Sequence, residues 1–192
     1  MYEIYDFFSF CIRWVLFMIK MITEEKLRRI KVDCLYGKKK HFNAADRKEK
    51  YHFSIGIPLV IINIIIGSVL LFYITDNTSG YLKAIPIVLA FIAAILSGFQ
   101  TYFNFNQKVE GHKNVANKYL ALMKKCDRTQ AYLKDEFISH NDLIIRIEDI
   151  ALEIESVNKE AALFSTSNND YQKAKEGIES GEEDYTEKEL NI

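Results

Sequence analysis

The sequence predicts an all-α membrane protein: a two-helix transmembrane hairpin with long cytoplasmic helices before and after it, plus an N-terminal amphipathic helix. Two long runs of the chain contain no Asp, Glu, Lys, Arg or His, and a short polar segment separates them. Apolar residues also recur at helical spacing on both sides of these runs. The uncharged runs indicate membrane spans, and the flanking periodicity indicates helices outside the membrane.

The two uncharged runs are Phe53–Thr75 and Ala84–Gln107. An α-helix rises about 1.5 Å per residue, so about 20 residues cross a hydrocarbon core about 30 Å thick. Both runs reach that length, and residues 53–107 therefore form the predicted hairpin. The alternative is a buried helical hairpin in a soluble protein, but such helices are usually shorter and keep a polar face.

The segment between the runs, Asp76–Lys83, is too short to form a domain, so we expect a tight connection. Each run has a proline near its start, Pro58 or Pro86, where the amides of a first helical turn lack intrahelical partners. Pro58 lies inside its run rather than at the first residue, which leaves open a bend where the helix meets the membrane.

Basic residues flank the two spans, whereas the connecting segment offers only Lys83 against Asp76. The flanking residues are Lys38, Lys39, Lys40, Arg47, Lys48 and Lys50 before the first span and Lys108, Lys113 and Lys118 after the second. By the positive-inside rule, both termini are expected to face the cytoplasm.

The net charge of −1 conceals a gradient along the 192 residues. Residues 1–52 contain 12 Lys and Arg against 7 Asp and Glu, whereas residues 165–192 contain 3 against 8. The basic half adjoins the membrane, where anionic lipid headgroups favour it. No nucleic-acid-binding fold accompanies these basic residues, so we expect membrane lipids as partners and no direct binding of nucleic acid.

The sequence predicts no catalytic or metal-binding chemistry. Its cysteines, Cys11, Cys34 and Cys126, form no CxxC pair, and its histidines, His41, His52, His112 and His140, are scattered. We also find no nucleophile with an attendant base, no paired carboxylates in a pocket-forming pattern and no glycine-rich phosphate loop. We therefore expect reduced thiols, no cofactor, no metal and no enzymatic activity.

Residues 1–22 are predicted to form an amphipathic helix in the plane of the membrane interface. On a helix, the polar residues Glu3, Asp6, Ser9, Arg13 and Lys20 fall near one face, and aromatic and aliphatic residues cover much of the remainder. The pattern leaves open a helix packed on a partner, a third span, or a helix packed on the protein's own core.

Three further segments are predicted outside the membrane. Residues 23–52 form a pre-membrane helix that Thr23–Glu25 opens, and residues 108–164 form a helical hairpin or coiled coil broken near Ser139–Asp142. The second helix of that hairpin has an apolar seam of Leu143, Ile147, Ile150, Ile154, Val157 and Ala161, which suits packing on the pre-membrane helix or on another subunit. Residues 165–192 form an acidic, partly disordered tail with one short helix, Tyr171–Glu179.

Small and polar residues inside the spans are the candidate functional residues. Asn63 lies near the middle of the first span, with Gly67 one turn further on the same face. In the second span Ala90, Ala94, Ser97, Thr101 and Asn104 share one stripe, and Gln100 stands beside it. Ala94 and Gly98 form a small-xxx-small pair. The stripe either packs the hairpin against itself or a sister subunit, or lines a water-filled path in a ring of hairpins; the residues alone favour packing.

Two segments of the chain resemble SLATT domains, the two-transmembrane effectors associated with bacterial nucleotide-synthase and SLOG-domain conflict systems. They are YGKKKHFNAADRKEKYHFSIGIPLVIINIIIGSVLLF and GFQTYFNFNQKVEGHKNVANKYLALMKK. The shared features are Ala44-Ala45, Gly56-Ile57-Pro58, Phe103-Asn104, Glu110, His112 and Tyr119. The likeness spans about Cys34 to Gly181, and DYQKAKEGIESG resembles the end of a branch found beside reverse transcriptases.

This resemblance implies a helical, multi-pass effector of the bacterial inner membrane. It implies a homo-oligomeric pore that disrupts that membrane as the toxic arm of an antiphage (abortive infection) system. The implied partner is a sensor, nucleotide-signalling or reverse-transcriptase protein encoded nearby. The alternative is a non-conducting membrane anchor or scaffold for a cytoplasmic partner. No catalytic residues are implied.

Overall fold

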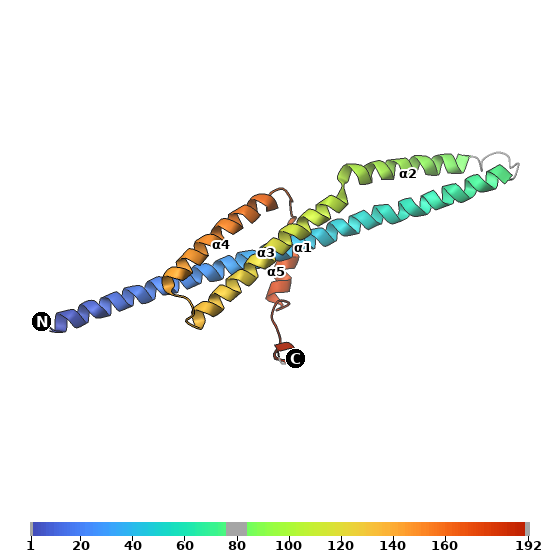
Figure 1. Cartoon of the computed structure of the whole chain (residues 1–192). Coiled ribbons are helices and arrows are strands. Elements are labelled where there is room, and N and C mark those ends of the chain that lie inside the picture. Colours follow the sequence, from blue (N-terminus) through green and yellow to red (C-terminus); the bar gives the residue numbers. More distant parts are fainter. Residues whose placement is uncertain (1, 76–83, 191–192) are drawn as a thin grey trace. The chain divides into compact units, whose positions relative to one another are not determined.

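The computed structural model of the protein describes residues 2–75 and 84–190, with side chains for Trp14 and for residues 21–71 and 84–190. All regular structure in these residues is helical (Figure 1). The helices are α1 (Tyr2–Thr75), α2 (Ala84–Phe103), α3 (Phe105–Lys134), α4 (His140–Ala161), α5 (Asn168–Glu179) and α6 (Glu187–Leu190). The predicted all-α fold is confirmed, whereas the connecting segment 76–83 lies outside the described residues.

The chain divides into two compact units. The bundle unit comprises Met1–Asn43 and His112–Ile192, and the hairpin unit comprises Ala44–Gly111. Helices α1 and α3 each contribute residues to both units, whereas α2 belongs to the hairpin unit and α4 and α5 to the bundle unit.

Helix α1 runs without interruption over 74 residues. The prediction that Thr23–Glu25 opens a new helix is therefore wrong, because the acidic residues that suit a first turn are also good interior helix formers. No helix end separates residues 2–22, 23–52 and 53–75. Pro58 accordingly lies in a helix interior, where it cannot donate the usual hydrogen bond to the carbonyl group of Ser54. The side chains of residues 1–13 and 15–20, which would test an interfacial helix, lie outside the described residues.

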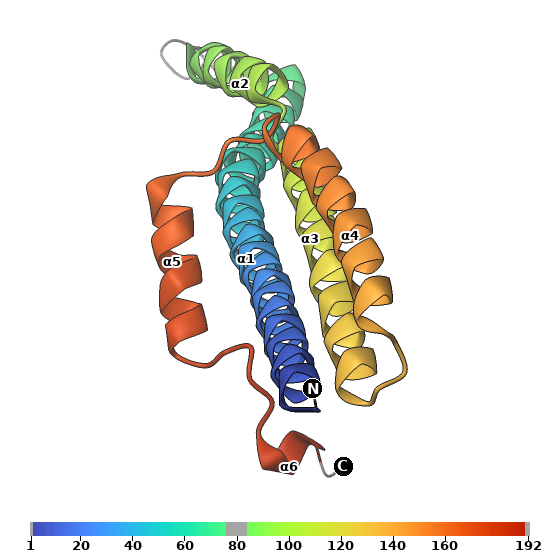
Figure 2. The ribbon, with the colours of Figure 1, turned by 90° about the vertical axis from the view of Figure 1, so that its left-hand side faces the viewer.

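Three helices of the bundle unit enclose a single apolar core (Figure 2). Its buried residues are Leu27, Ile30 and Cys34 of α1, Val115, Tyr119, Leu122 and Cys126 of α3, and Leu143, Ile147, Ile150 and Val157 of α4. The predicted seam of α4 is thus buried within the chain, against the pre-membrane part of α1 and against α3. Of the two interpretations of this seam, packing on the pre-membrane helix is the one observed.

Serine caps begin both α4 and α5. The Ser139 hydroxyl accepts a hydrogen bond from the amide of Asp142, and the Asp142 carboxylate accepts one from the Ser139 amide. Ser167 and Asp170 form the same capping box at α5. The predicted break at Ser139–Asp142 is confirmed, and α5 begins at Asn168, three residues before the predicted start.

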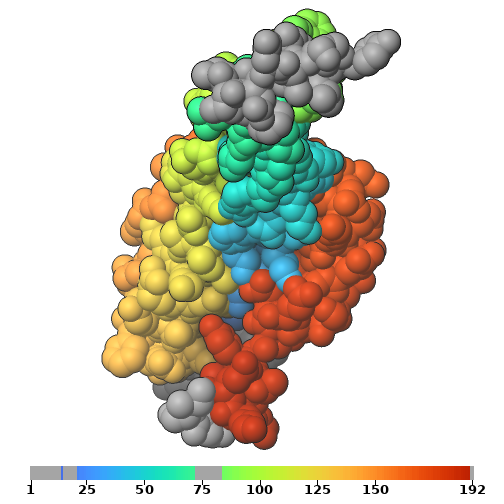
Figure 3. Space-filling model, turned by 90° about the vertical axis from the view of Figure 1, so that its right-hand side faces the viewer, coloured from blue at the N-terminus to red at the C-terminus, as the bar shows by residue number. Residues whose placement is uncertain are grey.

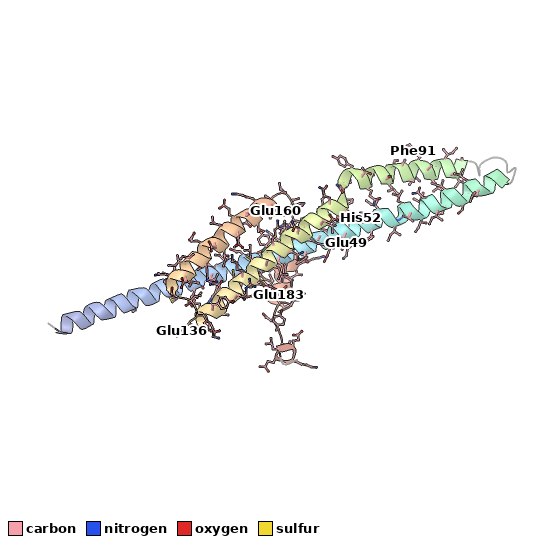
Figure 4. The ribbon with its side chains drawn as sticks, in the orientation of Figure 1. Glu49, His52, Phe91, Glu136, Glu160 and Glu183 are labelled. Carbon is pink, nitrogen blue, oxygen red and sulfur yellow. The ribbon has the colours of Figure 1, made fainter. Side chains whose placement is uncertain are left out.

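Polar pairs join the outer edges of the bundle helices. Glu160, labelled in Figure 4, accepts hydrogen bonds from Lys118 and from Asn114 of α3, the latter at 2.8 Å. The Lys31 ammonium lies 2.5 Å from the Asp127 carboxylate and so joins α1 to α3. Partly exposed pairs of this kind contribute at most about 1 kcal/mol each, so the buried apolar core provides most of the bundle's stability.

We predict that Gly37→Ala destabilises the bundle. A Cβ at Gly37 would lie 2.9 Å from three ring carbons of Tyr119. That ring is only 5% exposed, and its hydroxyl is held by Asn158, so it has little room to move. The expected loss is about 1–3 kcal/mol of unfolding free energy, measured by thermal and denaturant unfolding in detergent.

Gly98→Ala is the matched control, because no atom lies within 4 Å of a Cβ at that helical position. Its helix propensity should leave stability unchanged or slightly higher. Equal melting temperatures for Gly37→Ala and the unsubstituted protein would contradict the close packing at Gly37.

Candidate functional site

The predicted site residues lie in the hairpin unit, where α1 and α2 run antiparallel. Each helix has one line of less exposed residues with alternating spacings of 3 and 4. On α2 the line is Pro86, Leu89, Ala93, Leu96 and Gln100, of which Pro86 and Ala93 are buried. On α1 it is Ile55, Leu59, Ile62, Ile66 and Val69, all half-buried. We infer that these two lines form the contact between the spans.

The small and polar residues stand beside this contact line, not on it. On α2, Ala90, Ala94, Ser97 and Thr101 each come one position after a residue of the line, and all four are exposed. On α1, Asn63 and Gly67 come one position after Ile62 and Ile66 and are also exposed. Successive helix residues are rotated by about 100°, so both stripes lie about a quarter turn from the contact.

Both stripes therefore lie on the same side of the hairpin. On each helix, the stripe residue follows a residue of the contact line by one position. Because the two helices run antiparallel, this same step turns both stripes toward the same side of the plane that contains the two helix axes. We call this side the polar side and define it by Asn63 and Gly67 of α1 and Ala90, Ala94, Ser97 and Thr101 of α2. Packing of the hairpin against itself does not use these residues, which remain available for contacts outside the chain.

The register of the two helices brings the stripes level with each other. A Cβ at Gly56 would lie 3.5 Å from Gln100 Nε2, so these residues are neighbours across the hairpin. Asn63 comes seven residues after Gly56 on α1, and Ala93 comes seven residues before Gln100 on α2. Asn63 therefore lies at about the depth of Ala94, and Gly67 at about the depth of Ala90.

Asn104 departs from the predicted stripe. Helix α2 ends at Phe103, and Asn104 adopts a left-handed backbone conformation with φ of 42°. Its backbone amide donates to the carbonyl of Gln100 at 3.2 Å, and its side-chain amide donates to Gln107 Oε1 at 2.6 Å. The uncharged run predicted a span over 84–107, but asparagine tolerates this conformation and ends the helix earlier.

Hydrogen bonding distinguishes the polar residues of the hairpin. The Thr101 hydroxyl donates to the carbonyl of Ser97 at 3.0 Å, and the Ser68 hydroxyl donates to that of Ile64 at 2.9 Å, each within its own helix. Among the described residues, the Asn63 amide has no such partner. An amide in hydrocarbon needs a partner or water, so Asn63 favours a contact with another chain or with a wet path.

The rest of the hairpin surface is apolar and exposed. Phe91, labelled in Figure 4, projects from α2 and is 69% exposed, and Ile87 is 71% exposed. Two helices in the described part of the chain are long and apolar enough to cross a membrane. Such surfaces are stable in lipid, where apolar side chains need no cover.

A comparison with protein-family models assigns this architecture to a family. Residues 23–189 match the model of SMODS and SLOG-associating 2TM effector domain family 4, SLATT_4. The chain belongs to this SLATT family. Its two apolar helices agree with the two transmembrane segments that the family description names, so the protein is a membrane protein with an effector role.

The predicted SLATT resemblance is confirmed by this match, which covers more of the chain than the resembling segments do. The reverse-transcriptase branch stays a prediction, because the match is to family 4 as a whole. Residues 1–22 precede the matched range. No curated protein and no solved structure matches the chain.

The bundle unit of this SLATT protein contains a buried histidine pair that the sequence analysis missed. His41 Nδ1 lies 3.1 Å from His112 Nδ1, and the two side chains are 2% and 1% exposed. Both residues continue apolar stripes, since His41 follows Cys34 by seven positions and His112 precedes Tyr119 by seven. That position on a buried helical face was the signal that the two histidines would meet.

Burial and neighbouring charges determine the protonation state of this histidine pair. The pKa of His41 is lowered to about 4, chiefly by burial and to a lesser extent by the charges of His112 and Lys40, while Asp170 opposes the change. Only one of two nitrogen atoms 3.1 Å apart can donate, so neutral rings share one proton in this contact. In the described residues, no group of three or more His, Cys, Asp or Glu side chains could hold a metal ion.

Two cysteines of the core are equally shielded. Cys34 and Cys126 are free and fully buried. Burial raises the pKa of Cys34 to about 12 and that of Cys126 to about 11, so both thiols stay protonated at neutral pH. A thiol in this state is a poor nucleophile and serves the core as an apolar group. Cys11 lies among the residues whose side chains are not described.

The tail contains a second feature that the sequence analysis missed. Helix α5 lies against α1 on the side away from α3 (Figure 3). The Tyr171 ring stacks on Tyr36 with centroids 5.7 Å apart, and the Asn43 amide donates to the carbonyl of Asp170 at 3.0 Å. Close approach is possible because Ala174 and Gly177 present no bulky side chain.

Two ion pairs hold the segment that follows α5. The Lys38 ammonium lies 2.5 Å from Glu183, which is labelled in Figure 4, and Lys39 pairs with Glu182. We call α5 together with Glu182 and Glu183 the C-terminal clasp. The acidic residues of the tail thus neutralise part of the basic run that precedes the first span. Disorder was predicted from Gly181 onward, but Glu182 and Glu183 are held in these ion pairs and Glu187–Leu190 form the short helix α6.

We predict that the stability of the bundle falls as the pH decreases from about 6.5 to about 4. Over this range the unfolded chain binds a proton at His41, whose ordinary pKa is 6.5, while the folded chain does not. The loss should reach about 3 kcal/mol at most, measured as denaturation midpoints across this pH range. His41→Gln should flatten the dependence; an unchanged slope in this variant would contradict the buried neutral pair.

We also predict that Glu182→Gln combined with Glu183→Gln loosens the clasp. Lys38 is only 7% exposed and would lose a charged partner, at a cost of about 1–3 kcal/mol. Hydrogen exchange of the α5 amides should become faster, while exchange in α4 should not change. Glu179→Gln is the control, because Glu179 is exposed and its ion pair in the described residues is with Lys175, one turn away in α5. Unchanged α5 exchange in the double variant would show that the ion pairs do not hold the clasp.

Proposed function

We propose that this SLATT protein forms an oligomeric pore in the bacterial inner membrane and thereby acts as the toxic arm of an antiphage (abortive infection) system. The observation that carries the proposal is the polar side of the hairpin, where Asn63 lies level with Ala94 and has no partner in the described chain. Small residues there allow close approach of a neighbouring helix, and the amide and hydroxyl groups suit water.

A pore requires several copies of the hairpin. Two helices cannot enclose a water-filled path, because lipid reaches them from every other direction. In the proposed homo-oligomer, each hairpin turns its polar side inward and the exposed apolar surface that includes Phe91 toward lipid. Membrane lipids and sister subunits are then the partners of the hairpin unit.

The bundle unit is proposed to receive the activating signal on the cytoplasmic side. The basic residues that flank both spans favour a cytoplasmic location for both termini. Helix α1 belongs to the bundle core and to the hairpin, so it connects a bundle-bound sensor directly to the spans. The proposed partner is a sensor, nucleotide-signalling or reverse-transcriptase protein encoded nearby. No catalytic step and no direct nucleic-acid contact is assigned to the chain.

The proposal predicts that Asn63→Leu or Thr101→Leu abolishes ion leakage from liposomes without preventing membrane insertion. Leucine removes the polar group and fills the space on the polar side, which closes a wet path by dewetting. The measurement is release of an entrapped ion, with full-length protein and, where needed, the product of the adjacent gene. A loss of at least about tenfold is expected.

Ser68→Leu is the matched control. Ser68 is an exposed polar residue of the same span, but it lies about two helix steps past the contact line and hence off the polar side. Leakage should be unaffected. If Asn63→Leu and Thr101→Leu leak as well as the unsubstituted protein, the polar side does not line the path. If the unsubstituted protein itself does not leak, even with the product of the adjacent gene, the hairpin is a membrane anchor or scaffold, and the pore proposal is wrong.

A further inference from the structure

A pocket of about 320 Å³ lies among α1, α3, α4 and α5 of the bundle unit. Its polar and aromatic lining comprises Asp33, Tyr36, Lys40, Tyr119, Asn158 and Tyr171. Pockets for small molecules range from about 300 to 1,000 Å³, so this one has room for a single small ligand. No feature of the hairpin enters it, and the proposed pore does not use it.

The aromatic walls of the pocket are held in place. The Tyr119 hydroxyl donates to Asn158 Oδ1 at 2.6 Å, and its ring lies against Gly37. Tyr36 and Tyr171 stack with an interplanar angle of 27°. Fixed aromatic faces favour a planar ring, because little side-chain entropy is lost when the ring packs against them.

The cation of the pocket differs from its neighbours in the sequence. Lys38 and Lys39 pair with Glu183 and Glu182, whereas Lys40 has no ion pair in the described part of the chain. Lys40 is half-buried and lines the pocket together with the three tyrosines, so its positive charge attracts an anionic group there. Burial of the Tyr119 hydroxyl raises its pKa, so it stays neutral and adds no competing negative charge.

A carboxylate and an amide complete the polar set. Asp33 lies seven residues before Lys40, about 10 Å along α1, too far for the two side chains to neutralise each other through a direct ion pair. The Asn158 amide nitrogen can still donate, because only its oxygen is used by Tyr119. The pocket therefore offers a cation at one place, a hydrogen-bond acceptor at another, and tyrosine faces between them.

We infer that this pocket binds a planar nitrogen heterocycle carrying an anionic group, of the size of a nucleoside 5′-monophosphate. Lys40 and the Asn158 amide face the anion, the tyrosine rings pack on the heterocycle, and Asp33 accepts from its N–H groups. Because Tyr171 belongs to α5, the ligand also contacts the C-terminal clasp. This inference is independent of whether the hairpin conducts.

Calorimetric titration of the full-length protein in detergent tests the inference. The probes are AMP, GMP, CMP and UMP, with the corresponding nucleosides and inorganic phosphate as separate arms. At least one nucleotide should bind with a Kd below about 1 mM and at least about tenfold more tightly than its nucleoside or phosphate alone. It should also raise the melting temperature of the protein.

Variants connect the binding to this pocket. Lys40→Ala should weaken the nucleotide at least about tenfold, and Tyr171→Ala should weaken it without changing the affinity for inorganic phosphate. Lys124→Ala is the control, because Lys124 is an exposed lysine of α3 outside the pocket. Circular dichroism and melting curves check that each variant is folded, and Lys40→Gln replaces Lys40→Ala if the latter unfolds.

Three outcomes would overturn the inference. They are saturation by none of the four nucleotides, equal affinities for Lys40→Ala and Lys124→Ala, and equal affinities for a nucleotide and inorganic phosphate. None of them bears on the pore, which liposome leakage measures separately.

Discussion

The rest of the structure depends on one constraint: the single helix α1 packs against two different sets of helices, one in the bundle and one in the hairpin. Between Leu27 and His41, α1 presents apolar residues to the bundle core, where burial of apolar surface drives packing. Between Ile55 and Val69, the same helix presents aliphatic residues to α2, where lipid competes equally well for them. Small residues such as Ala93 and Gly56 therefore have to provide the close approach that hydrophobicity cannot provide there.

This difference explains where polar groups are found. In the bundle core, the polar groups of α1 and α3 find partners, as His41 does with His112 and Tyr119 with Asn158, because each would otherwise lose its bonds to water. In the hairpin, Thr101 satisfies its hydroxyl within its own helix, but Asn63 does not. A polar group without a hydrogen-bond partner costs far more free energy in lipid than at a wet surface. The polar side of the hairpin therefore points to a role outside the single chain.

Much of the fold could be predicted from the sequence, because a lipid environment and a helical-bundle core each require a recognisable pattern of residues. The two runs without charged residues predicted the spans. The helical spacing of the apolar residues from Leu143 to Ala161 predicted the buried face of α4. The continuity of α1 could not be predicted, because Thr23–Glu25 suits a helix start and a helix interior equally. The break at Asn104 was hidden by spacing that continued the stripe across it, and the common polar side required knowledge of which residues face the other helix.

The C-terminal clasp shows why the remaining features escaped prediction. Composition alone describes Ser165–Ile192 as an acidic tail, since its few apolar residues cannot form a core by themselves. They do not need to, because Tyr171 stacks on Tyr36 and Glu183 pairs with Lys38, and both partners already stand on a rigid helix. The tail is therefore ordered by its contacts with α1, close to the histidine pair and the tyrosine-lined pocket. Order in the tail therefore depends on residues of α1 that precede the first span, and no composition-based interpretation of the tail by itself could reveal them.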